Sequence, residues 1–181
     1  MTVQALREAY ERVIEPVDPV AVIVTCASGG DKAGCLVTFS GPCSIDPPRY
    51  AVWLSHLNHT YRVALGADEL IVHMLTRADL ALAELFGGIS GVHEDKFARV
   101  RWSDSDGIPL LPVSGGWLRG RILSRVPGRL EMGGDHTCFV LAPTAAEDGE
   151  DGEDGEGAGG TSRRLRLSDV RHIRPGQPGG E

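Results

Sequence analysis

The chain has 181 residues, of which 41% are hydrophobic, and this suits one domain with a proper core and room for a tail. Its formal net charge is −7, but much of the acidity lies in residues 146–160, where Asp and Glu alternate with Gly. The rest of the chain is close to neutral, which argues against a nucleic-acid-binding surface because such a surface is basic.

No apolar run approaches the roughly 20 residues that a membrane-spanning helix needs. The N-terminal residues 1–16 are charged and amphipathic, unlike a signal peptide. We therefore expect a cytoplasmic protein that does not bind membranes. The chain has four cysteines, Cys26, Cys35, Cys43 and Cys138. They lack the C-x-x-C spacing of a zinc site and are too few to stabilise a chain of this length by disulfide bonds. This favours free thiols in the core.

The first two predicted elements are a helix and a β-hairpin. Apolar residues recur at helical spacing before Pro16, which predicts an amphipathic helix over residues 3–14. Residues 21–27 and 34–40 are β-rich runs on either side of a cluster of turn residues. This arrangement predicts a hairpin.

The next stretch, TFSGPCSIDPP at residues 38–48, contains small and hydroxyl-bearing residues and ends on two prolines. Proline has no backbone N–H and pushes the preceding residue out of the helical region, so Pro47 and Pro48 force a turn. The hydroxyls and bare backbone before the turn suit the close approach of a polar ligand. The alternative is that these hydroxyls bond only to nearby backbone.

Strands are predicted over residues 50–57 and 69–75, with room for a short helix between them. Thr76 is the expected cap of a further helix, Asp79 completes a variant of the capping box, and Gly87-Gly88 ends the helix. Three more strands are predicted, over residues 97–102, 115–126 and 135–144. Six or seven short strands with two or three helices predict a mainly β protein, a closed β-barrel with helices at its ends.

The common enzyme motifs are absent. The sequence contains no G-x-G-x-x-G after a strand, no P-loop and no nucleophile elbow. His56, His59 and His73 lie on separate predicted elements without metal-ligand spacing, so no metal site is expected. Asp135 and His136 are an acid and a base, but neighbours on a strand point to opposite faces. We therefore do not expect this pair to orient one another, and no hydrolytic triad is predicted.

The order of several motifs resembles a known family. Between about residues 20 and 142 the chain contains, in this order, AGCLVTFSGPCSIDPP, LNHTYRVAL, LALAELFGG, DKFARVRW, GIPLLP and GGDHTCFV. Each motif alone is common, but six in the right order are specific, and together they resemble the flavin reductase-like, FMN-binding split β-barrel family. The resemblance implies a split barrel with peripheral helices over residues 1–145, and a homodimer with one flavin per subunit near the interface.

The resemblance also implies an activity. Members of this family are flavin-binding oxidoreductases, so we expect an NAD(P)H:flavin oxidoreductase that reduces FMN, or FAD as the alternative, with NADH or NADPH as reductant. It would hand reduced flavin to a partner monooxygenase. The alternatives are a flavoprotein that oxidises another small substrate, or a non-catalytic split-barrel protein that binds flavin or heme.

Two regions are implied to bind the flavin. The segment before the two prolines lines the flavin in the family, and the matching residues here are Thr38, Ser40, Cys43 and Ser44. The second region begins at Asn58, where family members often have two hydroxyl residues that hold the flavin phosphate at the start of a short helix.

This second region departs from the family pattern. Thr60 keeps the first hydroxyl, but Arg62 occupies the place of the second. Arginine binds phosphate bidentately, so Arg62 is expected to take over this task. The alternatives are that this region binds a different ligand, or that Arg62 is a solvated residue of the helix.

His136, within GGDHTCFV, matches a family position close to the flavin ring and the nicotinamide. The resemblance implies that its imidazole holds the two rings in stacking distance, since hydride transfer itself needs no protein acid. Lys96 and Phe97 also match a family motif but suit a purely structural role equally well.

The C-terminal region is the largest departure from the family. Residues 146–162 predict a disordered acidic, Gly-rich linker because they have nothing to bury. Residues 163–181 form a basic tail, either with a last strand that includes Leu165, Leu167 and Val170 or fully solvated. A chain cut after Ala146 is expected to fold and retain flavin.

Overall fold

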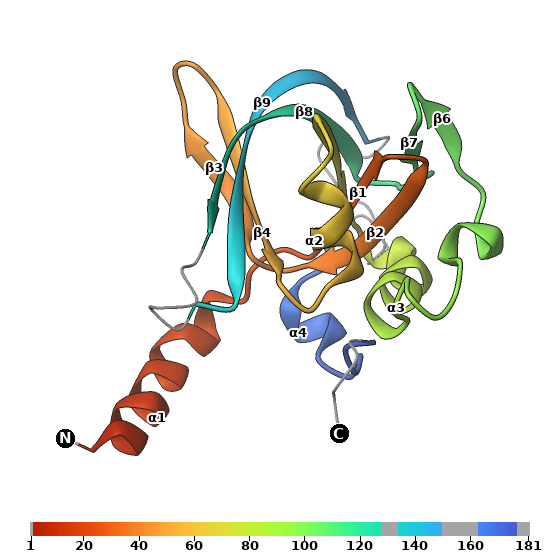
Figure 1. Cartoon of the computed structure of the whole chain (residues 1–181). Coiled ribbons are helices and arrows are strands. Elements are labelled where there is room, and N and C mark those ends of the chain that lie inside the picture. Colours follow the sequence, from red (N-terminus) through yellow and green to blue (C-terminus); the bar gives the residue numbers. More distant parts are fainter. Residues whose placement is uncertain (1, 128–133, 150–162, 177–181) are drawn as a thin grey trace.

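The computed structural model describes residues 2–127, 134–149 and 163–176 (Figure 1). Its helices are α1 (Val3–Ile14), α2 (His59–Ala64), α3 (Leu80–Gly88) and α4 (Leu167–Val170), with 3-10 helices η1 (Glu15–Val17), η2 (Arg77–Asp79) and η3 (Lys96–Arg99). Its strands are β1 (Val22–Ser28), β2 (Asp31–Val37), β3 (Ser40–Ser44), β4 (Arg49–Ser55), β5 (Glu69–Met74), β6 (Ser103–Ser105), β7 (Ile108–Leu110), β8 (Gly116–Pro127) and β9 (His136–Asp148).

Seven strands form one antiparallel sheet in the order β2-β1-β5-β8-β9-β4-β3. The sheet curls so that its two halves face one another, and the long strands β8 and β9 arch across the top in Figure 1. Within the described residues β2 and β3 are the two edges of this sheet. The barrel is therefore split, as the family resemblance implied, and is not closed by a continuous ladder.

The predicted hairpin of β1 and β2 is confirmed, with a tighter turn than expected. Only Gly29 and Gly30 lie between the strands, and their φ angles are +61° and +89°. A two-residue hairpin turn of this type needs a positive φ at both positions, which glycine adopts without strain.

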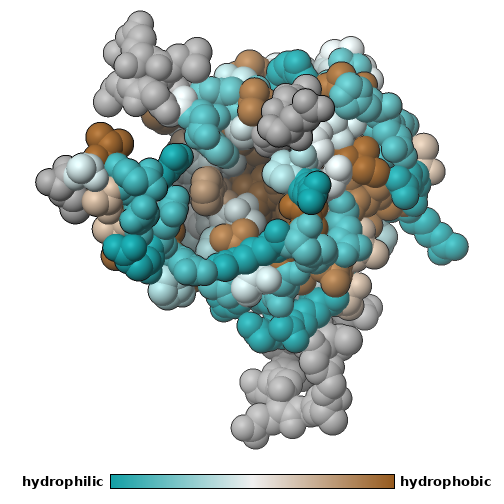
Figure 2. Space-filling view, turned by 90° about the horizontal axis from the view of Figure 1, so that it is seen from below, coloured by the Kyte–Doolittle hydropathy of each residue, from teal (hydrophilic) through white to brown (hydrophobic). Residues whose placement is uncertain are grey.

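The core has two parts, one on each face of β1. Val22, Val24 and Cys26 face the inside of the barrel with α2, whereas Ala21 and Ile23 pack with α3 and the C-terminal residues. Burial on both faces explains why residues 21–24, at the start of this strand, are an unbroken apolar run. The view from below shows hydrophobic residues in the recessed centre of the molecule, with hydrophilic residues around them (Figure 2).

Helix α1 has the predicted bounds and projects away from the barrel (Figure 1). The Thr2 side chain caps it by accepting from the N–H of Ala5. No residue of this helix is buried, and its apolar side chains remain exposed. The helix that begins after the Thr76–Asp79 capping box is also confirmed, as η2 followed by α3.

The predicted strand over residues 97–102 is wrong. Residues Lys96–Arg99 form a 3-10 helix instead, in which the Asp95 carboxylate accepts from the N–H of Phe97. The Phe97 ring is buried against Phe86, 5.5 Å between ring centroids, so core packing determines the local conformation. A hairpin that the sequence analysis missed, β6–β7, follows it.

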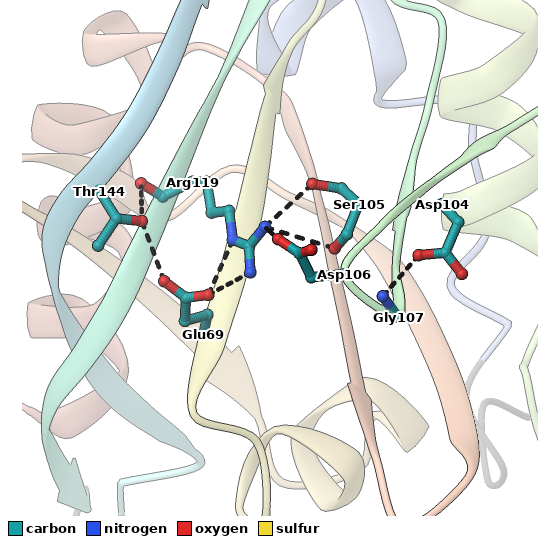
Figure 3. Close-up of polar contacts among 7 residues, drawn as sticks. All are labelled: Glu69, Asp104, Ser105, Asp106, Gly107, Arg119 and Thr144. Carbon is teal, nitrogen blue, oxygen red and sulfur yellow. Dashed lines mark hydrogen bonds and ion pairs between the residues drawn. The ribbon is translucent and has the colours of Figure 1, made fainter.

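An ion-pair network ties this hairpin to the main sheet (Figure 3). On β8, the Nε of Arg119 donates to Glu69 at 2.8 Å, and its Nη1 donates to the hydroxyl of Ser105 at 3.1 Å and to Asp106. Glu69 also accepts from Thr144 at 3.0 Å. Hydrogen bonds with Asp106 and Glu69 raise the pKa of Arg119. The guanidinium therefore joins β5, β8 and the hairpin.

The residues after the predicted linker are not a solvated tail. Leu165 and Val170 are buried in the outer part of the core, against α3 and β1. Two isolated β-bridges and the short helix α4 replace the single strand that was the other expectation. Truncation after Ala146 would therefore remove core residues.

The four cysteines do not all lie in the core, contrary to the sequence-based expectation. Cys26 and Cys35 are buried, but Cys43 is exposed on edge strand β3 and Cys138 is half-buried on β9. Cys138 alternates with Phe139, whose ring points into the core, so the thiol faces outward. Across the described parts of the chain, no helix is long and apolar enough to cross a membrane.

Candidate functional site

The end of β4 is flanked by two segments that the sequence analysis had singled out. On one side, Ser55 pairs with His136 of β9. On the other, the N–H of Trp53 donates to the carbonyl of Phe39 at 2.9 Å, which brings the residues between β2 and β3 alongside β4. The sheet order β9-β4-β3 thus places Thr38 and His136 on either side of the same strand end.

His136 and Asp135 contact one another, which corrects the expectation that they point apart. Nδ1 of His136 donates to Oδ1 of Asp135 at 2.6 Å. Strand alternation does not apply because β9 begins at His136 and Asp135 lies in the preceding loop. The hydrogen bond with His136 lowers the pKa of Asp135, so the carboxylate stays ionised. It fixes the imidazole's orientation and leaves Nε2 for a ligand.

A second imidazole, His56, lies in the same region. Its Nε2 is 3.0 Å from the hydroxyl of Thr137, and its backbone N–H donates to the carbonyl of Asp135 at 2.9 Å. Its ring packs against Tyr61, 4.9 Å between centroids. The sequence pattern marks His56 only as a candidate metal ligand, although its position just before Asn58 is a signal for the site.

Thr38 and Asn58 line one cavity of about 330 Å³. Asn58 stands at the N-cap of α2, but its side chain makes no capping hydrogen bond, so the amide can bond to a ligand. Apolar side chains provide other parts of the wall, among them Leu36, Phe86 and Ile89. The cavity therefore combines an apolar surface with a few polar groups, as small-molecule sites do.

Ser40, Cys43 and Ser44 lie along the β3–β4 hairpin and do not line this cavity. The hydroxyl of Ser40 is 3.1 Å from that of Tyr50, so it has a partner within the hairpin. Ser44 pairs with Arg49 next to the turn. At about 3.3 Å per strand residue, this places Ser44 well over 10 Å along the hairpin from Thr38.

Thr60 and Arg62 both belong to α2, but their side chains lie in different environments. Thr60 is buried, and its carbonyl accepts from the Cys26 thiol at 3.7 Å. Its hydroxyl bonds to Cys35, opposing the rise in the pKa of that thiol caused by burial. Arg62 is exposed and lines a separate cavity of about 540 Å³ with Asp31 and other residues.

Lys96 has a structural role in this chain. Its buried ammonium donates to the carbonyl of Gly34 at 2.8 Å and to that of Phe86 at 3.2 Å, joining β2 to the end of α3. Burial lowers the pKa of Lys96. Phe97 packs in the core beside it.

The residues around the 330 Å³ cavity fit a flavin. Its volume lies at the lower end of the range for small-molecule sites, about 300–1,000 Å³. Its apolar wall suits a flat aromatic ring, and Thr38 and Asn58 offer the polar groups that a ribityl chain or a ring edge requires. Neither Cys43 nor Ser44 lines this cavity or the 540 Å³ cavity.

Comparisons with known proteins identify relatives of this chain. The reductase component of an FADH(2)-dependent resorcinol hydroxylase from Rhizobium sp. (strain MTP-10005) is 29% identical over 123 residues, which cover 67% of this chain and 65% of the relative. The chain thus spans slightly less than two thirds of that relative's length.

Two solved structures share the fold. Nitrilotriacetate monooxygenase component B from Mycobacterium thermoresistibile has a TM-score of 0.70 at 18% identity, with 84% of this chain and 81% of that chain covered. An NADH:FAD oxidoreductase from Streptomyces globisporus C-1027 has a TM-score of 0.70 at 20% identity, with 82% and 86% covered. A family model described as "Flavin reductase like domain" matches residues 17–163. With most of its length matched, the chain belongs to the flavin reductase-like family.

Proposed function

We propose that this protein is an NAD(P)H:flavin oxidoreductase that binds FMN or FAD and supplies reduced flavin to a partner monooxygenase. The observation that carries the proposal is the cavity lined by Thr38 and Asn58, with the Asp135–His136 pair outside its lining at the end of neighbouring strand β4. A bound flavin would supply the redox chemistry, taking up hydride from the nicotinamide and delivering two electrons, so the protein's task is to position the two rings.

The chain's residues divide this task. The apolar wall of the cavity holds the flavin ring and excludes water, while Thr38 and Asn58 orient it through hydrogen bonds. His136, held by Asp135, places its Nε2 beside the nicotinamide or the flavin edge. Contacts of Ser40, Cys43, Ser44, Thr60 and Arg62 with the flavin remain predictions from the family resemblance.

The relatives support the proposed partner and the proposed flavin. One relative is named as the reductase component of a hydroxylase and a second as component B of a monooxygenase, which supports a monooxygenase as the acceptor of reduced flavin. Two of the names include FAD or FADH(2), so FAD is as strong a candidate as FMN.

We also infer a homodimer. Helix α1 exposes Leu6, Tyr10 and Val13, and the outer face of the sheet exposes Trp53 and Val126. A 12-residue helix is marginal in water by itself, and exposed apolar surface on this scale favours a symmetric partner. The free thiols agree with a reducing compartment such as the cytoplasm.

Anaerobic stopped-flow absorbance tests the activity. We expect bleaching of the visible absorbance band of oxidised flavin when NADH or NADPH is added to the protein with FMN or FAD. A protein that binds flavin but leaves it oxidised with both nucleotides would refute the reductase and favour a non-catalytic flavin-binding protein. Sedimentation velocity tests the dimer, and a monomer at micromolar concentration would contradict it.

A further inference from the structure

The C-terminal segment, residues 164–176, is bound firmly to the barrel. The N–H of Leu165 donates to Leu75 at 2.9 Å, and its carbonyl accepts from Ala21 at 2.8 Å. Asp18 accepts from the N–H and the hydroxyl of Ser168 at 2.7 and 2.9 Å. These bonds surround a buried Leu165 side chain. These hydrogen bonds and the burial of Leu165 therefore fix the position of the segment on the barrel.

This segment forms one wall of the cavity that contains Thr38 and Asn58. Its lining residues are Leu167, Val170, Arg171, Ile173, Pro175 and Gly176. The approach to α3 is close: the N–H of Gly176 donates to the carbonyl of Gly87 at 3.1 Å, and a Cβ at Gly87 would lie 3.1 Å from Ile173. The cavity is thus incomplete without the C-terminal segment.

Arg171 gives this cavity a positive charge. Among the described residues that line it, Arg171 alone is charged. Its Nη1 donates to Glu15 at 2.8 Å, and its side chain is 47% exposed, so other N–H groups of the guanidinium remain within reach of a ligand. Arg62 lines a different cavity, which it shares with Asp31.

We propose that the C-terminal segment is part of the flavin site and that Arg171 binds a phosphate group there. The inference rests on the proposed function, because it takes the cavity to be the flavin site. Guanidinium groups bind phosphate through paired, charge-assisted hydrogen bonds. Glu15 holds the arginine in place in the absence of ligand and competes with the phosphate for it. The phosphate belongs either to the flavin or to the nicotinamide dinucleotide.

Three variants of the full-length protein test the role of Arg171. Dissociation constants for FMN and for riboflavin, which lacks the phosphate, are measured by fluorescence. We expect Arg171→Gln to raise the constant for FMN about tenfold and to leave that for riboflavin within about twofold. Glu15→Gln should tighten FMN, because it removes the competing carboxylate. The control, Arg174→Gln, changes an exposed arginine of the same segment that does not line the cavity.

A second arm distinguishes the two sources of phosphate. If Arg171→Gln leaves FMN binding unchanged but raises KM for NADH and not for 1-benzyl-1,4-dihydronicotinamide, which has no phosphate, then the dinucleotide supplies the group. Equal weakening of FMN and riboflavin binding would mean that Arg171 only supports the cavity wall, and would overturn the proposal. Unchanged flavin dissociation constants together with an unchanged KM for NADH would overturn it as well.

Measurements on the wild-type protein distinguish a failure of this inference from a failure of the proposed function. If the wild type reduces flavin and Arg171→Gln matches it in every constant, only the inference fails. If Arg171→Gln weakens FMN binding but the wild type never reduces flavin, only the proposed reductase activity fails. A wild type that binds neither flavin would overturn both. Thermal unfolding of Arg171→Gln checks that the segment stays docked.

Discussion

Nδ1 of His136 lies 2.6 Å from Oδ1 of Asp135, so the first residue of β9 is held by the last residue of the loop before it. The ring of Phe39 lies beside the imidazole, 5.4 Å between centroids. The imidazole is therefore oriented from two sides, by a carboxylate and by an aromatic ring. Such support is what a group that positions a substrate ring needs.

His136→Ala should slow NAD(P)H oxidation about tenfold or more, equal to about 1.4 kcal/mol of transition-state stabilisation, with little change in flavin affinity. Single-turnover anaerobic kinetics measure the rate, and fluorescence titration measures the affinity. A variant as fast as wild type would leave the reductase proposal standing but make the histidine structural.

Asp135 acts through His136, so its removal should have a smaller effect on the same step. We expect Asp135→Asn to reduce kcat several-fold without changing the flavin dissociation constant, and Asp135→Glu to restore part of the rate because it returns a carboxylate to Nδ1. In the His136→Ala background, Asp135→Asn should have no further effect. Additive losses in the double variant would show that the two residues act independently.

The sequence predicted elements whose signals are local. The helix at residues 3–14 has the expected bounds because spacing and Pro16 define it. The β6–β7 hairpin was missed, although Asp106-Gly107, with φ angles of +50° and +86°, is a typical turn pair. Residues 97–102 were misassigned because Phe97 is held by core packing, which a short β-rich pattern does not reveal.

The site was predicted only in part because it depends on contacts between distant residues. Thr38 and His136 lie on either side of the end of β4 because β9, β4 and β3 are neighbours in the sheet. No local sequence pattern reveals this strand order. Arg171 was missed for the same reason: the pairing of Leu165 with Leu75 and Ala21 brings it to the cavity across 90 or more residues.

His73 should make the protein less stable in mild acid. It is fully buried; its Nδ1 donates to Ile23 at 3.1 Å and its Nε2 accepts from Leu111 at 3.0 Å, so the folded protein needs the neutral ring. Burial lowers the pKa of His73 to about 4. In the unfolded chain the pKa is about 6.5. The stability from the neutral ring is thus present above pH 6.5 and is lost as the pH falls towards 4.

The size of this effect is about 3 kcal/mol between pH 7 and pH 4. Urea unfolding of wild type and His73→Gln over this pH range isolates it, because the carboxylates titrate alike in both proteins. The variant should be less stable at pH 7 but lose less stability on acidification. Parallel pH profiles for the two proteins would show that His73 is not the group responsible.

Leu165→Ala should lower the free energy of unfolding by about 2–4 kcal/mol, because the side chain is buried between β1, β5 and α3 and its loss leaves a cavity. Leu123→Ala, at a position 46% exposed on β8, is the matched control and should cost much less. Equal costs would mean that the C-terminal segment does not contribute to the core in solution.

The chain's two lysines provide a test of whether Lys96 serves structure or flavin binding. Lys96→Met removes the donor to the carbonyls of Gly34 and Phe86, which stay buried, so unfolding should become easier by about 1–3 kcal/mol. Lys32→Met is the control, because Lys32 is exposed and only stacks over Trp102 at 5.4 Å. Flavin affinity of the folded Lys96→Met protein should match wild type, since the ammonium is occupied within the fold. A large loss of flavin affinity at unchanged unfolding free energy would instead place Lys96 at the cofactor.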